Sequence, residues 1–175
     1  SLTSLDSVDD QAQTEIASMD EAFPLFGSDA RLDSLDLVSV ITDLEEALTA
    51  SAQGFAIWSK TDVEARGAIL RKAASLIRDR AEHIAILLTT EQGKPLAEAR
   101  GEVASSAALF DYYAEEAKRA YGRVLVRPTG QRSMVIKQPV GPTATFTPWN
   151  FPVLQAVRKL SPALAAGCSA ILKAP

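Results

Sequence analysis

The feature that most constrains this chain is an ordered series of apolar and helix-forming segments near its C-terminal end. Residues 143–146 are predicted to form a short strand, and residues 169–172 a second, apolar strand. Between them, Pro152 suits the first turn of a helix, because its φ is fixed and it has no N–H to satisfy, and Gly167 suits the helix end. A strand, a helix and a strand within this length predict a βαβ unit with parallel neighbouring strands.

Polar residues follow both predicted strands. Trp149 and Asn150 come after the first strand, and Lys173 comes directly after the second. Open parallel sheets hold their ligands beyond the carboxyl ends of their strands. We therefore expect the binding site at this edge, and the chain contains no Gly-x-Gly-x-x-Gly fingerprint to place one elsewhere.

Long amphipathic helices are predicted ahead of this unit. The first runs over about residues 61–89, and its apolar stripe consists of Ile69, Ala73, Leu76, Ile77, Ile84 and Leu88. Gly93-Lys94-Pro95 then breaks the pattern, and Lys94 is interpreted as a solvated loop lysine ahead of a proline helix start. The seam of the second helix is predicted to pack on the first. It comprises Leu96, Ala99, Val103, Ala107, Phe110, Ala114, Ala117 and Tyr121.

After Gly122 the pattern changes to a hairpin. Residues 124–127 and 133–137 are predicted strands, joined by a turn that contains Pro128 and Gly130. A two-stranded hairpin is marginally stable by itself, so this segment is expected to meet a partner.

Composition excludes several classes of protein. A chain of 175 residues suits one domain, or one domain with an appendage, and its net charge of −4 gives no basic surface for nucleic acid. A single cysteine excludes an internal disulfide, and with a single histidine the chain is expected to hold no metal. No signal peptide or membrane-length apolar run is present, so a cytoplasmic protein without membrane contact is expected.

Residues 1–42 form an acidic, mostly helical segment that differs from the rest. Leu25-Phe26-Gly27-Ser28 and Leu32-Asp33-Ser34-Leu35, followed by an acidic helix, resemble part of an acyl carrier protein over about residues 20–48. The resemblance implies phosphopantetheine attachment at Ser34, where a helix N-terminus favours a phosphate. The plainer alternative is that Asp33 or Ser34 caps the helix.

A second resemblance covers about residues 43–175. Motifs at the predicted ligand edge and on the helices before it are similar to the N-terminal part of the aldehyde dehydrogenase family, and closest to its succinate-semialdehyde dehydrogenase-like members. These motifs are Thr147-Pro148-Trp149-Asn150-Phe151-Pro152, Ile171-Leu172-Lys173, Glu91-Gln92-Gly93-Lys94-Pro95 and Gly101-Glu102-Val103. The resemblance implies an α/β fold with an incomplete Rossmann-like parallel sheet, preceded by long amphipathic helices. It also implies a projecting β-hairpin at 124–137 that builds a homo-oligomer.

The same resemblance implies a chemistry. A small aldehyde would be oxidised to a carboxylic acid through a cysteine thiohemiacetal, with hydride passing to NAD or NADP. Asn150 would be catalytic, its amide donating to the developing oxyanion. Arg158 would bind a distal substrate carboxylate, and Lys173 the cofactor's ribose hydroxyls. The implied cofactor-binding residues are Thr147, Pro148, Trp149, Asn150 and Lys173.

Plainer interpretations stay open. Asn150 suits a helix cap, Trp149 a core position and Arg158 a helix surface. Cys168 is expected to be an apolar filler, because relatives carry their nucleophile and general base beyond Pro175. The chain alone is therefore expected to be inactive, and the alternatives are a non-catalytic binding or assembly module, or a carrier role through Ser34.

Overall fold

The structure is a computed structural model that describes residues 34–174, with side-chain surroundings from residue 39 onward. The chain divides into two compact units, Ser1–Glu45 and Glu46–Pro175. The first contributes the start of helix α2 (Ser34–Trp58). The side chain of Ser34 and the carrier-like segment before it lie outside the described residues. None of the described helices has the length and apolar character needed to cross a membrane.

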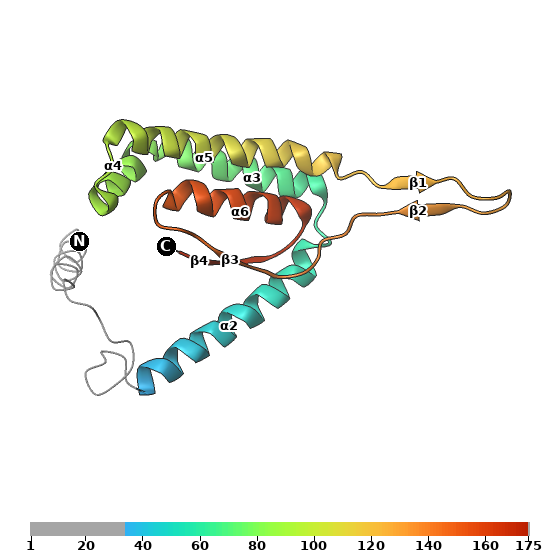
Figure 1. The fold of residues 1–175 in the computed structure, drawn as a ribbon, viewed down its shortest axis with the longest axis horizontal. Helices are drawn as coiled ribbons and strands as arrows, with labels where there is room; N and C mark the ends of the chain where they lie inside the picture. Colours follow the sequence, from blue (N-terminus) through green and yellow to red (C-terminus); the bar gives the residue numbers. More distant parts are fainter. Residues whose placement is uncertain (1–33, 175) are drawn as a thin grey trace. The chain divides into compact units, whose positions relative to one another are not determined.

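Helices and strands of the second unit form layers (Figure 1). Helices α3 (Val63–Asp79) and α5 (Leu96–Glu116) lie side by side, and α6 (Pro152–Ala166) packs against them. On its other side α6 contacts two short strands, β3 (Thr143–Phe146) and β4 (Ala170–Lys173). The predicted α/β class is confirmed, and the parallel sheet consists of these two strands among the described residues.

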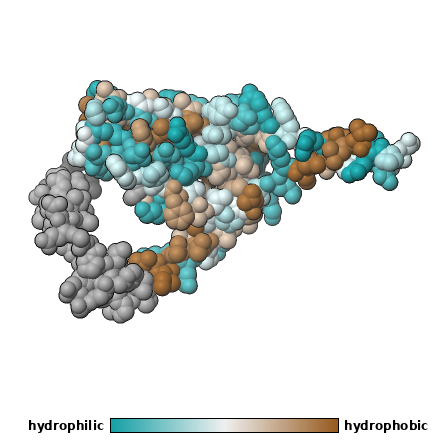
Figure 2. Space-filling model, in the orientation of Figure 1, coloured by the Kyte–Doolittle hydropathy of each residue, from teal (hydrophilic) through white to brown (hydrophobic). Residues whose placement is uncertain are grey.

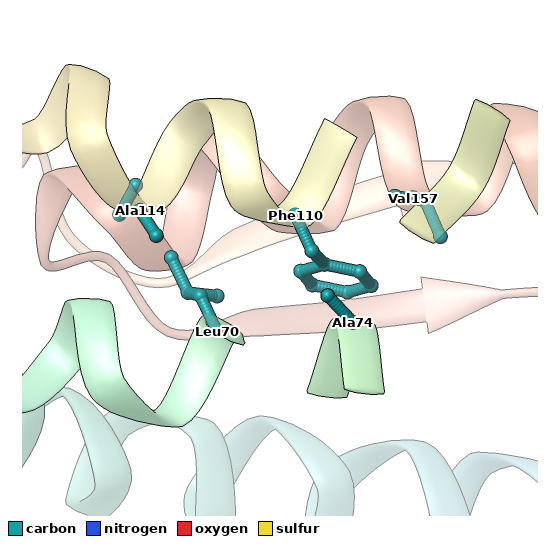
Figure 3. Packing of buried hydrophobic residues seen from close by; sticks show 6 residues of the cluster. Leu70, Ala74, Phe110, Ala114 and Val157 are labelled. Atoms are coloured by element: carbon teal, nitrogen blue, oxygen red, sulfur yellow. The ribbon is translucent and has the colours of Figure 1, made fainter. Parts of the chain in front are cut away.

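The core forms where the three helices meet (Figure 3). Leu70 of α3 is 1% exposed and packs in one cluster with Phe110 of α5 and Val157 of α6. Ala74 and Ala114 are also fully buried there. Their small side chains let the helix backbones approach closely, so the seam predicted for the second helix is confirmed over its central positions.

The single helix predicted over residues 61–89 is wrong. The chain leaves helical geometry at Arg80 (φ −109°, ψ 14°), which separates α3 from α4 (Ala81–Gln92). Neither glycine nor proline marks this break in the sequence. Tertiary packing explains it, because α4 turns so that its own apolar residues form a second cluster with the start of α5. That cluster contains Ala85, Leu88, Ala99 and Val103.

The apolar stripe predicted for the first helix is confirmed in part. Leu88 is buried in the second cluster, and Ala73, Ile77 and Ile84 pack against the two clusters. Ile69 is 54% and Leu76 39% exposed, and Leu70 and Ala74 are buried instead. The pattern contains enough apolar residues to support two adjacent faces, and packing against α5 selects one of them.

The βαβ unit is confirmed. Strands β3 and β4 pair in parallel, with Thr143 opposite Ala170 and Phe146 opposite Lys173. Helix α6 begins at Pro152 and ends at Ala166, and its C-cap Gly167 adopts the left-handed conformation (φ 94°) that glycine tolerates best. The second strand starts and ends one residue later than predicted, so Lys173 is its last residue. The carbonyl oxygen of Ser169, just before it, accepts hydrogen bonds from both the N–H and the hydroxyl of Thr143 at 2.9 Å.

The predicted hairpin is present and projects away from the helices (Figure 1). Its strands β1 (Arg123–Leu125) and β2 (Ser133–Val135) pair antiparallel and are shorter than predicted. At its base Gly122 is required sterically, since a Cβ there would lie 2.3 Å from the carbonyl oxygen of Val135.

Candidate ligand edge of the parallel strand pair

The carboxyl ends of β3 and β4 meet at one edge, as the sequence predicts. Phe146 pairs with Lys173, so Thr147 lies one position beyond the register partner of Lys173, at the same edge. Lys173 is exposed. Thr147 is 7% exposed, and its Oγ1 is buried without a hydrogen-bond partner among the described residues. The edge thus combines a free ammonium donor with an unsatisfied buried hydroxyl.

The turn between β3 and α6 presents the side chains of Trp149 and Asn150 to solvent. Trp149 is 75% exposed, so the interpretation of this indole as core is wrong for the described chain. Asn150 is exposed as well. The N-cap residue of α6 is Phe151, so the interpretation of Asn150 as the helix cap is also wrong. Within the described part of the chain its carboxamide has no hydrogen-bond partner and is available to a ligand.

The backbone of this turn is held by the connection between α4 and α5. The Nε2 atom of Gln92 donates to the carbonyl oxygen of Trp149. The Nζ atom of Lys94 donates to the carbonyl oxygen of Asn150 at 3.0 Å and lies 4.5 Å from the ring centroid of Phe151. Two consecutive peptide groups are therefore fixed from a segment more than fifty residues earlier in the sequence.

Glu102, in the middle of α5, completes this arrangement. Its Oε2 lies 2.5 Å from the Lys94 Nζ, and its Oε1 accepts hydrogen bonds from the Val153 and Leu154 N–H groups at 3.0 and 3.1 Å. The first turn of a helix leaves such N–H groups unpaired, and a negative charge there is favoured by the helix dipole. Because Phe151 makes no side-chain cap, the Glu102 carboxylate caps α6 from another helix.

The interpretation of Lys94 as a solvated loop lysine is wrong. Its side chain is 11% exposed, and that of Glu102 is 0% exposed. The lysine faces inward because the proline-initiated start of α5 places it over the buried face of that helix, where the carboxylate lies. No role was predicted for Glu102 from the sequence. Its position nevertheless indicates a buried charge, because it follows Ala99 by three positions and precedes Val103, and both belong to the predicted apolar seam.

Two other candidates lie outside this cluster. Arg158 is exposed on α6, next to the buried Val157. It lies six positions beyond Pro152, about 9 Å along the helix axis. Cys168 is a free thiol that is 4% exposed, a position suited to an apolar filler and not to a nucleophile that meets a substrate.

The chemistry of this edge suits a dinucleotide. Lys173 supplies a donor for hydroxyl groups, Thr147 a buried hydroxyl that lacks a partner, and Trp149 an exposed aromatic face. These groups gather at the strand ends where parallel sheets bind nucleotides. Across the described residues, no cluster of three or more histidine, cysteine, aspartate or glutamate side chains is arranged to hold a metal ion.

Comparisons with known proteins agree with one another. The pattern of the "Aldehyde dehydrogenase family" matches residues 39–175. The 4-(hydroxymethyl)benzenesulfonate dehydrogenase TsaD1 of Comamonas testosteroni is 50% identical over 144 residues, which are 82% of this chain and 30% of that protein. The NADP(+)-dependent succinate-semialdehyde dehydrogenase GabD of Escherichia coli K12 is 44% identical over 128 residues, 73% of this chain and 27% of that enzyme.

A solved structure of an aldehyde dehydrogenase has a similar fold. The crystal structure of aldehyde dehydrogenase from Brucella melitensis biovar abortus 2308 superposes with a TM-score of 0.76 at 49% identity, over 77% of this chain and 28% of that one. This chain therefore spans about 30% of the length of the relatives it matches. The resemblance of the first segment to an acyl carrier protein receives no support from these comparisons.

Proposed function

This chain belongs to the aldehyde dehydrogenase family, and we propose that it supplies the oxyanion-binding and cofactor-binding edge of an NAD(P)-dependent semialdehyde dehydrogenase. The observation that carries the proposal is the exposed, unpaired Asn150 carboxamide on a turn whose backbone is fixed from a neighbouring layer. Members of this family use NAD or NADP, which accepts hydride when bound.

Asn150 acts as the oxyanion donor in this proposal. When a nucleophile attacks the aldehyde carbon, the carbonyl oxygen gains negative charge, and a side-chain N–H that already points at it stabilises the transition state. Such a donor needs a fixed backbone and a free amide. Both conditions are met by the turn that carries Asn150.

Cofactor and substrate contacts follow from the same edge. Lys173 donates to ribose hydroxyls, and Trp149 with the backbone of Thr147 and Pro148 lines the cofactor cleft. Arg158 binds the distal carboxylate of a semialdehyde, for which a guanidinium fork is well suited. The dehydrogenase part begins at about residue 43, and the cytoplasm is the proposed location.

The test uses the protein as expressed from its own gene, with succinate semialdehyde and either NAD⁺ or NADP⁺. We expect reduced cofactor to form, and Asn150→Ala to lower kcat by about 10²- to 10³-fold. Asn150→Asp keeps the size of the side chain but loses the donor, so it is expected to fail similarly. Lys60→Ala, at an exposed position away from the edge, is the matched control. Equal kcat in wild type and Asn150→Ala sinks the proposal.

The hairpin supports a homo-oligomer. Apolar side chains are exposed along it (Figure 2), among them Val124 at 78%, Val126 at 100% and Met134 at 70%. Exposed apolar strands of this kind mark a protein interface, and we propose a second copy of the chain as the partner. Val126→Asp is expected to shift the molar mass measured by light scattering toward the monomer. If Val126→Asp has the same molar mass as the wild type, the hairpin does not have this role.

A further inference from the structure

We propose that Lys94, Glu102 and Gln92 are positioning residues for Asn150, which fix the backbone that carries its carboxamide before any substrate binds. The inference rests on the proposed oxyanion role of Asn150 for its functional meaning. Its structural content stands on contacts between the α4–α5 corner and the turn before α6.

Two peptide groups flank the Cα atom of Asn150, and each is held by a side chain from the α4–α5 corner. The carbonyl of Trp149 belongs to the preceding peptide and is held by Gln92. The carbonyl of Asn150 belongs to the following peptide and is held by Lys94 at 3.0 Å. With both peptide planes held, φ and ψ of Asn150 are set, and so is the direction of its Cα–Cβ bond.

A lysine alone is a poor anchor, because its four-carbon stem is flexible and loses rotamer entropy when it is held. Here the ammonium is locked by the Glu102 carboxylate, 2.5 Å away, on the buried face of α5. The same carboxylate binds the N–H groups of Val153 and Leu154. The Glu102 carboxylate therefore holds both the turn, through Lys94, and the start of α6.

Burial of this pair is hard to explain by stability alone. Removing two charges from water carries a desolvation cost that the ion pair offsets only with good geometry and further hydrogen bonds. An apolar pair would fill the corner equally well, but it would leave two α6 N–H groups and the Asn150 carbonyl without partners. What Lys94 and Glu102 provide here, and an apolar pair would not, is a fixed orientation of the turn. Preorganised donors of this kind need no rearrangement when charge develops on a substrate.

Asn150 is the only asparagine among these 175 residues. Labelling with isotopic asparagine therefore gives, from this part of the protein, one backbone amide and one side-chain amide in a nuclear magnetic resonance spectrum, and both are absent in Asn150→Ala. In the wild type we expect a backbone order parameter of about 0.85 at this residue, typical of rigid backbone. In Lys94→Met, which keeps the stem length and removes the ammonium, it is expected to fall below about 0.6.

The control is Leu70→Val, a substitution in the α3–α5 core that lowers stability without touching the turn. It is expected to leave the Asn150 signal unchanged, and Lys94→Arg, which retains a charged donor, to restore part of the order. If Lys94→Met does not fold, Gln92→Met removes only one tie and gives the same readout. A rigid Asn150 backbone in the folded Lys94→Met or Gln92→Met variant overturns the proposal.

Activity gives a second readout that separates the two proposals. In the active protein, Lys94→Met is expected to lower kcat by about 10- to 100-fold, as small misplacements of a catalytic group do, with little change in KM for the cofactor. If Asn150 loses order in Lys94→Met but Asn150→Ala keeps full kcat, the positioning stands and the oxyanion role fails. If Asn150→Ala loses kcat while Lys94→Met changes neither order nor kcat, the positioning fails and the oxyanion role stands.

Discussion

Two regions of the helical layer use the same kind of interaction in different surroundings. Between α3 and α5, Arg78 pairs with Asp111 on the surface, with side chains 52% and 39% exposed. At the α4–α5 corner, Lys94 pairs with Glu102 with side chains 11% and 0% exposed. The surface pair joins helices that are already packed through an apolar core. The corner pair joins elements at a point where backbone groups need partners.

The difference between the two pairs lies in what the charged groups bind. Exposed ion pairs contribute little, because water and salt screen them. Glu102 instead satisfies two amides and an ammonium at once. Its contribution is therefore geometric as well as energetic.

The largest effect is expected when the corner loses its carboxylate. Glu102→Ala leaves a buried ammonium and two α6 N–H groups unpaired, so the free energy of unfolding should fall by about 3–5 kcal/mol. Urea unfolding followed by circular dichroism measures it. Glu98→Ala, at an exposed position of the same helix, is the control and should change little. A loss for Glu102→Ala no greater than that of the control contradicts the buried role.

The βαβ unit could be predicted from the sequence because the residues that indicate it are close together in the chain. Pro152 and Gly167 delimit α6 without help from the rest of the fold. The ligand edge follows from chain topology, which places Phe146 beside Lys173, so that the residues after β3 begin at the end of β4. The break at Arg80 and the inward side chain of Lys94 depend on contacts between distant segments. No local pattern encodes those contacts, although a glutamate inside an apolar seam is a sign that such contacts exist.

A smaller effect is expected at the surface of the same layer. Arg78→Ala removes the pair with Asp111 and should lower the free energy of unfolding by at most about 1 kcal/mol. The same urea experiment, repeated in high salt, should reduce the difference further. A loss as large as that of Glu102→Ala would remove the distinction between the two regions.

The smallest effect concerns a second surface pair. A hydrogen bond from Lys118, with further help from Arg71, lowers the pKa of Glu115 below its ordinary value. Its carboxylate therefore stabilises the fold above the pKa of the unfolded chain, and this contribution is lost as pH falls through the folded pKa. Glu115→Gln should lower the urea midpoint slightly at neutral pH and not at all in strong acid. If the difference in urea midpoint between wild type and Glu115→Gln grew as the pH falls, the carboxylate would not stabilise the fold in the way described.

The most direct test of the claim that burial decides what a charge pair does here is a pair of double-mutant cycles. One combines Lys94→Met with Glu102→Gln, and the other Arg78→Met with Asp111→Asn. We predict a coupling free energy of about 2–3 kcal/mol for the corner and below about 1 kcal/mol for the surface. Equal coupling in the two cycles would contradict the claim, because the corner would then be one more ordinary ion pair.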